Sequence, residues 1–149
     1  MRALVQRVSE GSVSIDGSVH SRIGKGFVIL LGIRTGDTNE AALFLADKCA
    51  GLRVFEDANH KMNLNLNDVH GSVLVVSQFT LYADAQKGNR PSFVEAARPE
   101  EAEPLYDVFV NQLRSHFGYG RVATGVFRAM MEVKILNDGP VTILIESKQ

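Results

Sequence analysis

The sequence contains one cysteine, no tryptophan and no long hydrophobic run, and each of these shortages narrows the class of protein. A single cysteine, Cys49, cannot form an internal disulfide, so we expect a fold held together by its core rather than by cross-links. No apolar run approaches the roughly 20 residues that span a bilayer, and the opening MRALVQRV lacks the pattern of a signal peptide. We therefore expect a cytoplasmic protein that does not bind membranes.

An excess of charge of either sign is also lacking. The chain has 16 Lys and Arg against 17 Asp and Glu, which gives a net charge of -1. Proteins that coat nucleic acid without specificity usually carry a large basic excess, so that class is disfavoured, whereas a local basic patch is compatible with these totals. With 149 residues, 45% of them hydrophobic, and no evident linker, the sequence predicts one domain over residues 1–149.

Common catalytic and metal-binding motifs are missing as well. The chain has no GxSxG, HExxH, GxxxxGK or paired-cysteine motif. Its four histidines, His20, His60, His70 and His116, are scattered through polar segments without metal-ligand spacing, so we expect each of them on the surface. We therefore expect neither a metal site nor a cofactor.

Alternating and β-branched apolar residues favour strands at both ends of the chain and in its middle. The segment SVLVVSQFTLYAD is typical of a central buried strand because its start is continuously apolar. In the strand MMEVKIL, we expect Met131, Val133 and Ile135 to lie on one face. Predicted strands cover residues 2–8, 12–15, 26–33, 72–84, 130–136 and 141–147.

Two segments have helical periodicity. Apolar spacing predicts a helix over about 38–50, with Asp37 in its N-terminal capping arrangement and Cys49 on its apolar stripe. A second helix follows with Pro104 in its first turn and Gly118 at its end. Seven or eight strands with two helices predict an α+β fold, in which a curved, barrel-like sheet carries the helices on its outside.

The stretch SQFTL is the first candidate for chemistry, because a hydrophobic strand runs directly into two hydroxyls, an amide and an aromatic ring. These polar groups either satisfy the local backbone or form a corner whose N–H groups stabilise the oxyanion of an acyl-transfer reaction. Neither Ser77 nor Thr80 has a base beside it in sequence. This favours a site that positions substrate and stabilises charge over one that uses an activated nucleophile.

The stretch KGNRPSF follows shortly afterwards. Its cations, Lys87 and Arg90, and its Phe93 are suited to holding a phosphate and stacking a base, although a solubilising surface turn has the same composition.

A third stretch, NDGPVT, interrupts the last predicted strand pair. Pro140 cannot donate to a ladder and Gly139 permits backbone angles that other residues avoid. The pair is either a plain turn or a shaped backbone surface.

The order of SQFTL, KGNRPSF and NDGPVT, together with the opening ALVQRV and the segment RVFEDANHKMNLNL, resembles the D-aminoacyl-tRNA deacylase family over essentially the whole chain. The resemblance implies a compact α+β homodimer that hydrolyses D-aminoacyl-tRNA without a metal or cofactor, with active sites at the subunit interface. It implies binding of the aminoacyl-tRNA 3′ end and no binding of DNA. Glycyl-tRNA mischarged on other tRNAs is a further expected substrate.

The same resemblance assigns roles to residues. Gly139 and Pro140 would be a cis dipeptide that enters the partner's pocket and rejects L-aminoacyl groups by contact with its main chain. The catalytic corner would comprise Ser77, Gln78, Phe79 and Thr80, with the ester carbonyl held by backbone N–H groups and the tRNA ribose 2′-hydroxyl assisting a water. The residues implied to bind substrate or support the site are Arg7, Lys87, Arg90, Phe127, Met131 and Asn137.

Two alternatives remain open at this point. One is a nonenzymatic protein of the same fold that binds the ends of nucleic acids. The other is an esterase that uses Thr80 as its nucleophile.

Overall fold

The structure is a computed structural model that describes residues 1–148. Its strands are β1 (Arg2–Ile15), β2 (Ser18–Ile23), β3 (Gly26–Gly32), β4 (Phe55–Glu56), β5 (Met62–Leu64), β6 (Ser72–Ser77), β7 (Val122–Thr124) and β8 (Glu132–Glu146). Its helices are α1 (Asn39–Gly51) and α2 (Pro99–Phe117), with short 3-10 helices η1 (Phe79–Tyr82) and η2 (Tyr119–Arg121). None of the helices within these described residues is long and apolar enough to cross a membrane.

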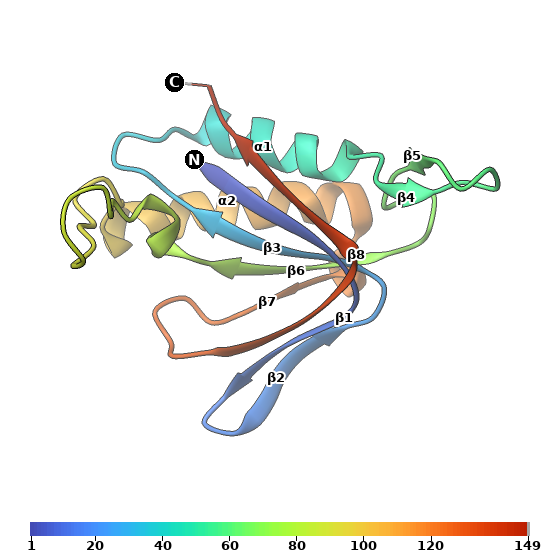
Figure 1. Cartoon of the computed structure of the whole chain (residues 1–149), viewed down its shortest axis with the longest axis horizontal. Helices are drawn as coiled ribbons and strands as arrows, with labels where there is room; N and C mark the ends of the chain where they lie inside the picture. Colours follow the sequence, from blue (N-terminus) through green and yellow to red (C-terminus); the bar gives the residue numbers. More distant parts are fainter. Residues whose placement is uncertain (149) are drawn as a thin grey trace.

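The main sheet curls on itself while both helices cover one of its faces (Figure 1). Its strand order is β2-β1-β3-β6-β7. Strand β8 lies off this path and pairs with both the first and the second half of β1. The strands β3, β6 and β7 run parallel, whereas β1 is antiparallel to all three of its partners. The expected fold class, a barrel-like α+β sheet with two outer helices, is confirmed.

Alternation along β3 divides the interior into two cores. Phe27, Ile29 and Leu31 face the helices and pack in the larger cluster, which includes the fully buried Phe109 of α2. Val28 points into the curl of the sheet and packs in a smaller cluster. Burying each such side chain contributes roughly 1.5–3 kcal/mol, so the two faces of this central strand hold the helices and the curled sheet together.

Met131, Val133 and Ile135 all pack against the smaller cluster, while Glu132 and Lys134 between them are exposed. The face expected for this strand is therefore confirmed.

Two of the predicted breaks between strands are wrong. The segments 2–8 and 12–15 form one strand, β1, and 130–136 and 141–147 lie within one strand, β8. In both cases the pairing of β1 with β8 continues past the predicted break, and only its register shifts, between Gln6 and Glu10. A bulge leaves residues unpaired but does not end the ladder. The local pattern of residue types is the same for a bulge and for a turn, so the sequence does not distinguish them.

The start of each helix also differs from expectation. The cap of α1 is Thr38, whose hydroxyl accepts a hydrogen bond from Ala41 N at 3.2 Å. Asp37 instead accepts from Arg34 N at 2.7 Å and pairs with the α-amino group of Met1 at 2.9 Å. The helix itself lies where it was predicted, and Cys49 is buried on it.

Helix α2 begins at Pro99, so Pro104 lies inside the helix and not in its first turn. The residues PEEAEP are mostly polar and exposed, and they gave no apolar period to mark the true start. Gly118 adopts a φ of 82° after the last turn, which confirms it as the residue that ends the helix.

Candidate active site

The predicted strand 72–84 ends early, and a cavity opens where it ends. Strand β6 stops at Ser77, Gln78 N donates to Leu31 O of β3 at 2.8 Å, and the chain then turns into η1. A cavity of about 440 Å³ opens at these strand ends, against the start of α2. It is lined by Leu31, Ile33, Ser77, Gln78, Phe79, Phe93, Ala96, Ala97, Pro99, Ala102, Phe127 and Arg128.

Two of the stretches singled out in the sequence meet at the mouth of this cavity. The rings of Phe79 and Phe93 pack edge to face with centroids 5.1 Å apart, although both are partly exposed. The loop between them is closed by two main-chain hydrogen bonds of 2.8 Å between Asp84 and Ser92. Exposed apolar rings beside a cavity provide a surface on which a nucleobase can stack.

Lys87 and Arg90 lie in the exposed tip of the same loop and are not among the cavity-lining residues of the described chain. They are placed to meet a ligand only where it extends beyond the cavity.

The first turn of η1 presents main-chain donors. Within residues 1–148, the N–H groups of Phe79 and Thr80 have no acceptor, because they precede the first hydrogen bonds of the helical turn. The Gln78 side-chain amide donates to the Thr80 hydroxyl. Thr80 is exposed and lies outside the cavity lining, next to the lining residue Phe79. Its hydroxyl is therefore at the rim, where it is bonded to Gln78.

Phe127 lines the cavity and is fixed from behind. Its ring packs against Tyr106 with centroids 5.8 Å apart, and the Tyr106 hydroxyl donates to Val75 O at 2.8 Å. Burial raises the pKa of Tyr106, so its hydroxyl stays a neutral donor. Met131, in contrast, packs in the smaller core cluster, away from the cavity lining.

Ionisable groups are scarce in this cavity. Of its lining residues in the described part of the chain, Arg128 alone carries an ionisable side chain, and no His, Asp, Glu, Lys or Cys accompanies it. The four histidines are all exposed, as expected, and none lines the cavity. The site thus offers main-chain donors, the Ser77 hydroxyl and the Gln78 amide, but no side-chain base among the described lining residues.

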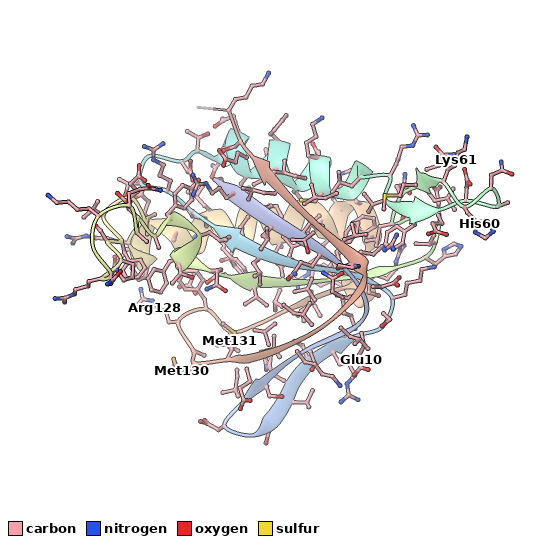
Figure 2. The ribbon with its side chains drawn as sticks, viewed as in Figure 1. Glu10, His60, Lys61, Arg128, Met130 and Met131 are labelled. Atoms are coloured by element: carbon pink, nitrogen blue, oxygen red, sulfur yellow. The ribbon has the colours of Figure 1, made fainter. Side chains whose placement is uncertain are left out.

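Sequence reasoning did not single out Arg128. It lies in the loop between β7 and β8, and Figure 2 shows it beside Met130 and Met131. Among the described lining residues it is the one with a positive φ, of 70°, which only the structure reveals.

Gly139 and Pro140 form a second cluster, away from the cavity. Gln6 pairs with Thr142 and Val8 pairs with Asn137, so four residues of β8 bulge out opposite Arg7 alone. The peptide bond between Gly139 and Pro140 is cis, and both residues are exposed.

Buried Arg7 anchors this bulge. Its guanidinium donates from Nη1 to Val54 O at 2.6 Å and from Nε to Asp138 O at 3.0 Å. From the other side, Asn137 Oδ1 accepts from Val141 N at 2.8 Å. The base of the bulge is therefore held by side-chain hydrogen bonds that replace the missing ladder.

The cavity and the bulge lie at different places in the sheet. Arg7 pairs with Phe27 at the start of β3, whereas Leu31 pairs with Ser77 where β3 and β6 end. Four residues of strand span about 13 Å, and the three strand spacings from β8 to β6 add about 14 Å across the sheet. The exposed dipeptide therefore does not reach the cavity of its own chain.

Comparison with known proteins places the chain in a family. The family model described as D-Tyr-tRNA(Tyr) deacylase matches residues 4–146. The chain is 56% identical to the D-aminoacyl-tRNA deacylase of Koribacter versatilis (strain Ellin345), covering 100% of this chain and 99% of that protein. It is 57% identical to that of Thermomicrobium roseum (strain ATCC 27502 / DSM 5159 / P-2), covering 100% and 96%.

Two solved structures resemble this fold. The structure of a protein named "c-Myc DNA Unwinding Element Binding Protein" has a TM-score of 0.95 and 43% identity, with 100% of both chains covered. The structure of a probable eukaryotic D-amino acid tRNA deacylase has a TM-score of 0.83 at 18% identity, covering 97% and 98%, which is evidence about the fold alone. The family-model match and the identities above 50% confirm what the motifs predict: the chain belongs to the D-Tyr-tRNA(Tyr) deacylase family.

Proposed function

We propose that the protein hydrolyses the ester bond of D-aminoacyl-tRNA and releases free tRNA and the D-amino acid. The observation that carries the proposal is the cavity beside η1. Phe79 lines it next to the ring of Phe93, the N–H groups of Phe79 and of the following Thr80 have no acceptor within residues 1–148, and the described lining residues include no side-chain base. Ester hydrolysis needs stabilisation of a developing oxyanion, which such N–H groups supply. Family membership supports the same substrate.

In the proposed reaction, a water molecule attacks the carbonyl carbon of the ester, while the carbonyl oxygen accepts hydrogen bonds from the N–H groups of Phe79 and Thr80. Ser77 and Gln78 hold the terminal adenosine. The tRNA's own 2′-hydroxyl assists the proton transfer, since the cavity lining offers no side-chain base. Thr80 has a positioning role, which its rim location and its bond from Gln78 support.

Selection of D-substrates is assigned to Gly139 and Pro140 of a second subunit. Inverting the α-carbon exchanges the side chain and the hydrogen, so a main-chain wall on one side collides with an L side chain and leaves a D side chain free. The dipeptide is suited to this role because it is exposed and its base is held by Arg7 and Asn137. Glycyl esters have no side chain to exclude, so glycyl-tRNA would be a substrate too.

A homodimer follows from this assignment. The dipeptide does not reach its own cavity, so only a second copy of the chain can bring it to one. Leu136 and Leu144, on either side of the dipeptide in β8, are 52% and 50% exposed. Apolar side chains of this size on an outer strand face are suited to burial against another subunit.

Beyond the cavity, Lys87 and Arg90 would contact the backbone of the tRNA 3′ end. Because the proposed substrate is a tRNA used in translation, we also propose that the protein acts in the cytoplasm. Their loop is exposed and ends at Phe93, which reaches the cavity mouth.

Incubation with D- and L-tyrosyl-tRNA tests the proposal. We expect release of tyrosine from the D-form alone, and a terminal 2′-deoxyadenosine should slow that release strongly. A Thr80 esterase would cleave both forms and accumulate an acyl-Thr80 adduct. Binding without hydrolysis is the second candidate, favoured by the similarity to a 43% identical protein that is named for binding DNA, and it predicts that neither form is cleaved.

A further inference from the structure

Arg128 has two properties that its neighbours in the cavity lack. It is the one ionisable side chain among the lining residues in the described chain. It also has a φ of 70°, in the left-handed region where a Cβ is unfavourable and where glycine or asparagine is the common occupant. Strained residues of this kind concentrate at functional sites, where the cost in stability is offset by what the side chain does.

The guanidinium of Arg128 is available for a ligand. Its ion pair within residues 1–148 joins it to Glu100 with 3.7 Å between Nη2 and Oε1, and the two side chains are 55% and 75% exposed. An ion pair at this distance and exposure contributes little to stability. It does not explain why an arginine occupies a backbone conformation that favours glycine.

The position of Arg128 limits which part of a substrate it meets. The rest of the lining is apolar or carries neutral polar groups, and the oxyanion donors belong to η1, a different segment from the loop that carries Arg128. The α-amino group of an aminoacyl ester is cationic and is repelled by a guanidinium. The remaining charged group that every aminoacyl-tRNA places next to its terminal nucleoside is the phosphodiester on the 5′ side of that nucleoside.

We propose that Arg128 binds the phosphodiester that joins the terminal adenosine of the tRNA to the preceding nucleotide. This inference rests on the proposed function of the cavity and adds a residue that fixes the 3′ end at its mouth. Arginine is suited to the role because its planar fork donates two parallel hydrogen bonds to phosphate oxygens. The weak pair with Glu100 leaves the guanidinium free to exchange that carboxylate for a phosphate.

The test compares two D-tyrosyl esters, one on tRNA and one on adenosine alone, which has no phosphodiester. The variant Arg128→Asn removes the charge while retaining a residue that tolerates the left-handed region, and Arg128→Lys keeps the charge. His60→Asn is the matched control, because His60 also has a positive φ, of 59°, but is exposed and outside the cavity lining.

For Arg128→Asn we expect KM for the tRNA ester to rise about 3- to 10-fold at low salt. The slope of log KM against log salt should fall by about 0.7, as for the loss of one phosphate contact on a single strand. The parent protein and Arg128→Asn should cleave the adenosine ester equally well. Arg128→Lys should keep most of the salt slope, and His60→Asn should match the parent on both substrates. The melting temperature of Arg128→Asn should be unchanged or slightly higher, because strain is relieved.

Three outcomes would overturn the inference while leaving the proposed function intact. The first is an unchanged KM and salt slope in Arg128→Asn. The second is an equal loss on both esters, which would make Arg128 a structural part of the wall. A parallel assay with D-aspartyl-tRNA gives the third: a loss confined to that substrate would make Arg128 a reader of the amino acid. If the parent protein itself does not cleave the D-tyrosyl ester of tRNA, the proposed function fails first.

Discussion

Replacing Arg7 with methionine tests whether this buried guanidinium supports the Gly139-Pro140 bulge. Methionine keeps most of the apolar stem of the side chain but has none of the guanidinium's hydrogen-bond donors. Arg7 is 7% exposed and lies opposite the four bulged residues of β8, so no water has easy access to replace it.

The magnitude follows from its two hydrogen bonds. Arg7 donates to Val54 O at 2.6 Å and to Asp138 O at 3.0 Å. Hydrogen bonds from charged groups contribute about 1.5–3 kcal/mol each, but the exposed Asp138 can regain water when its donor is removed. The ion pair between Arg7 Nε and Asp138 Oδ2, at 3.6 Å with an exposed carboxylate, adds little. We therefore expect a loss of about 2–4 kcal/mol, which is about 5 to 15 °C in melting temperature.

Urea unfolding at fixed protein concentration measures this loss, because the stability of a dimer depends on concentration. The matched control is Arg22→Met, since Arg22 is exposed on β2 and its side chain makes no hydrogen bond or ion pair within residues 1–148. A looser bulge should also discriminate less, so the ratio of L- to D-tyrosyl-tRNA cleavage should rise at least tenfold. An Arg7→Met protein as stable and as selective as the parent would refute the support role.

Further predictions concern three other positions. Gly139→Ala should destabilise the bulge by about 1–3 kcal/mol and abolish selectivity, because φ is 138° and the new Cβ would lie 2.9 Å from the main-chain nitrogen two residues later. Urea unfolding measures the first effect, and cleavage of the two tyrosyl-tRNAs measures the second. Thr80→Ala should slow D-tyrosyl-tRNA cleavage about tenfold without abolishing it, and complete loss in a folded protein would favour the nucleophile. Hydrogen bonds from Gln112 and then His116 lower the pKa of Asp47. Its carboxylate therefore stabilises the fold at any pH above the pKa that Asp47 has in the unfolded chain, and this stabilisation is lost as the pH falls through the pKa that it has in the folded protein. Asp47→Asn should therefore cost less than about 1 kcal/mol at neutral pH and nothing near pH 2, by urea unfolding at both, and an equal cost at both would refute the sign.

Local patterns predicted the parts of the fold that depend on local physics. A continuous apolar run predicted β3, helical spacing predicted α1, and Gly118 marked the end of α2, because each signal is complete within one element. The same holds for the special backbone of Gly139 and Pro140, whose residue types alone indicate an interruption.

The arrangement of the site depended on contacts between distant segments. Arg7 and Asp138 are 131 residues apart in sequence, and only the pairing of β1 with β8 brings the guanidinium under the bulge. Arg128 gave no local signal, because its role arises from a loop conformation and from the wall that α2 completes.

By itself, the sequence determined the family, the α+β class and the residues of its three motifs, since residue type and short-range spacing carry that information. Only the tertiary structure decided that the cavity at Ser77–Phe79 and the dipeptide at 139–140 lie far apart in one chain, because strand register sets that separation. Register is a property of paired strands, and no single segment contains it.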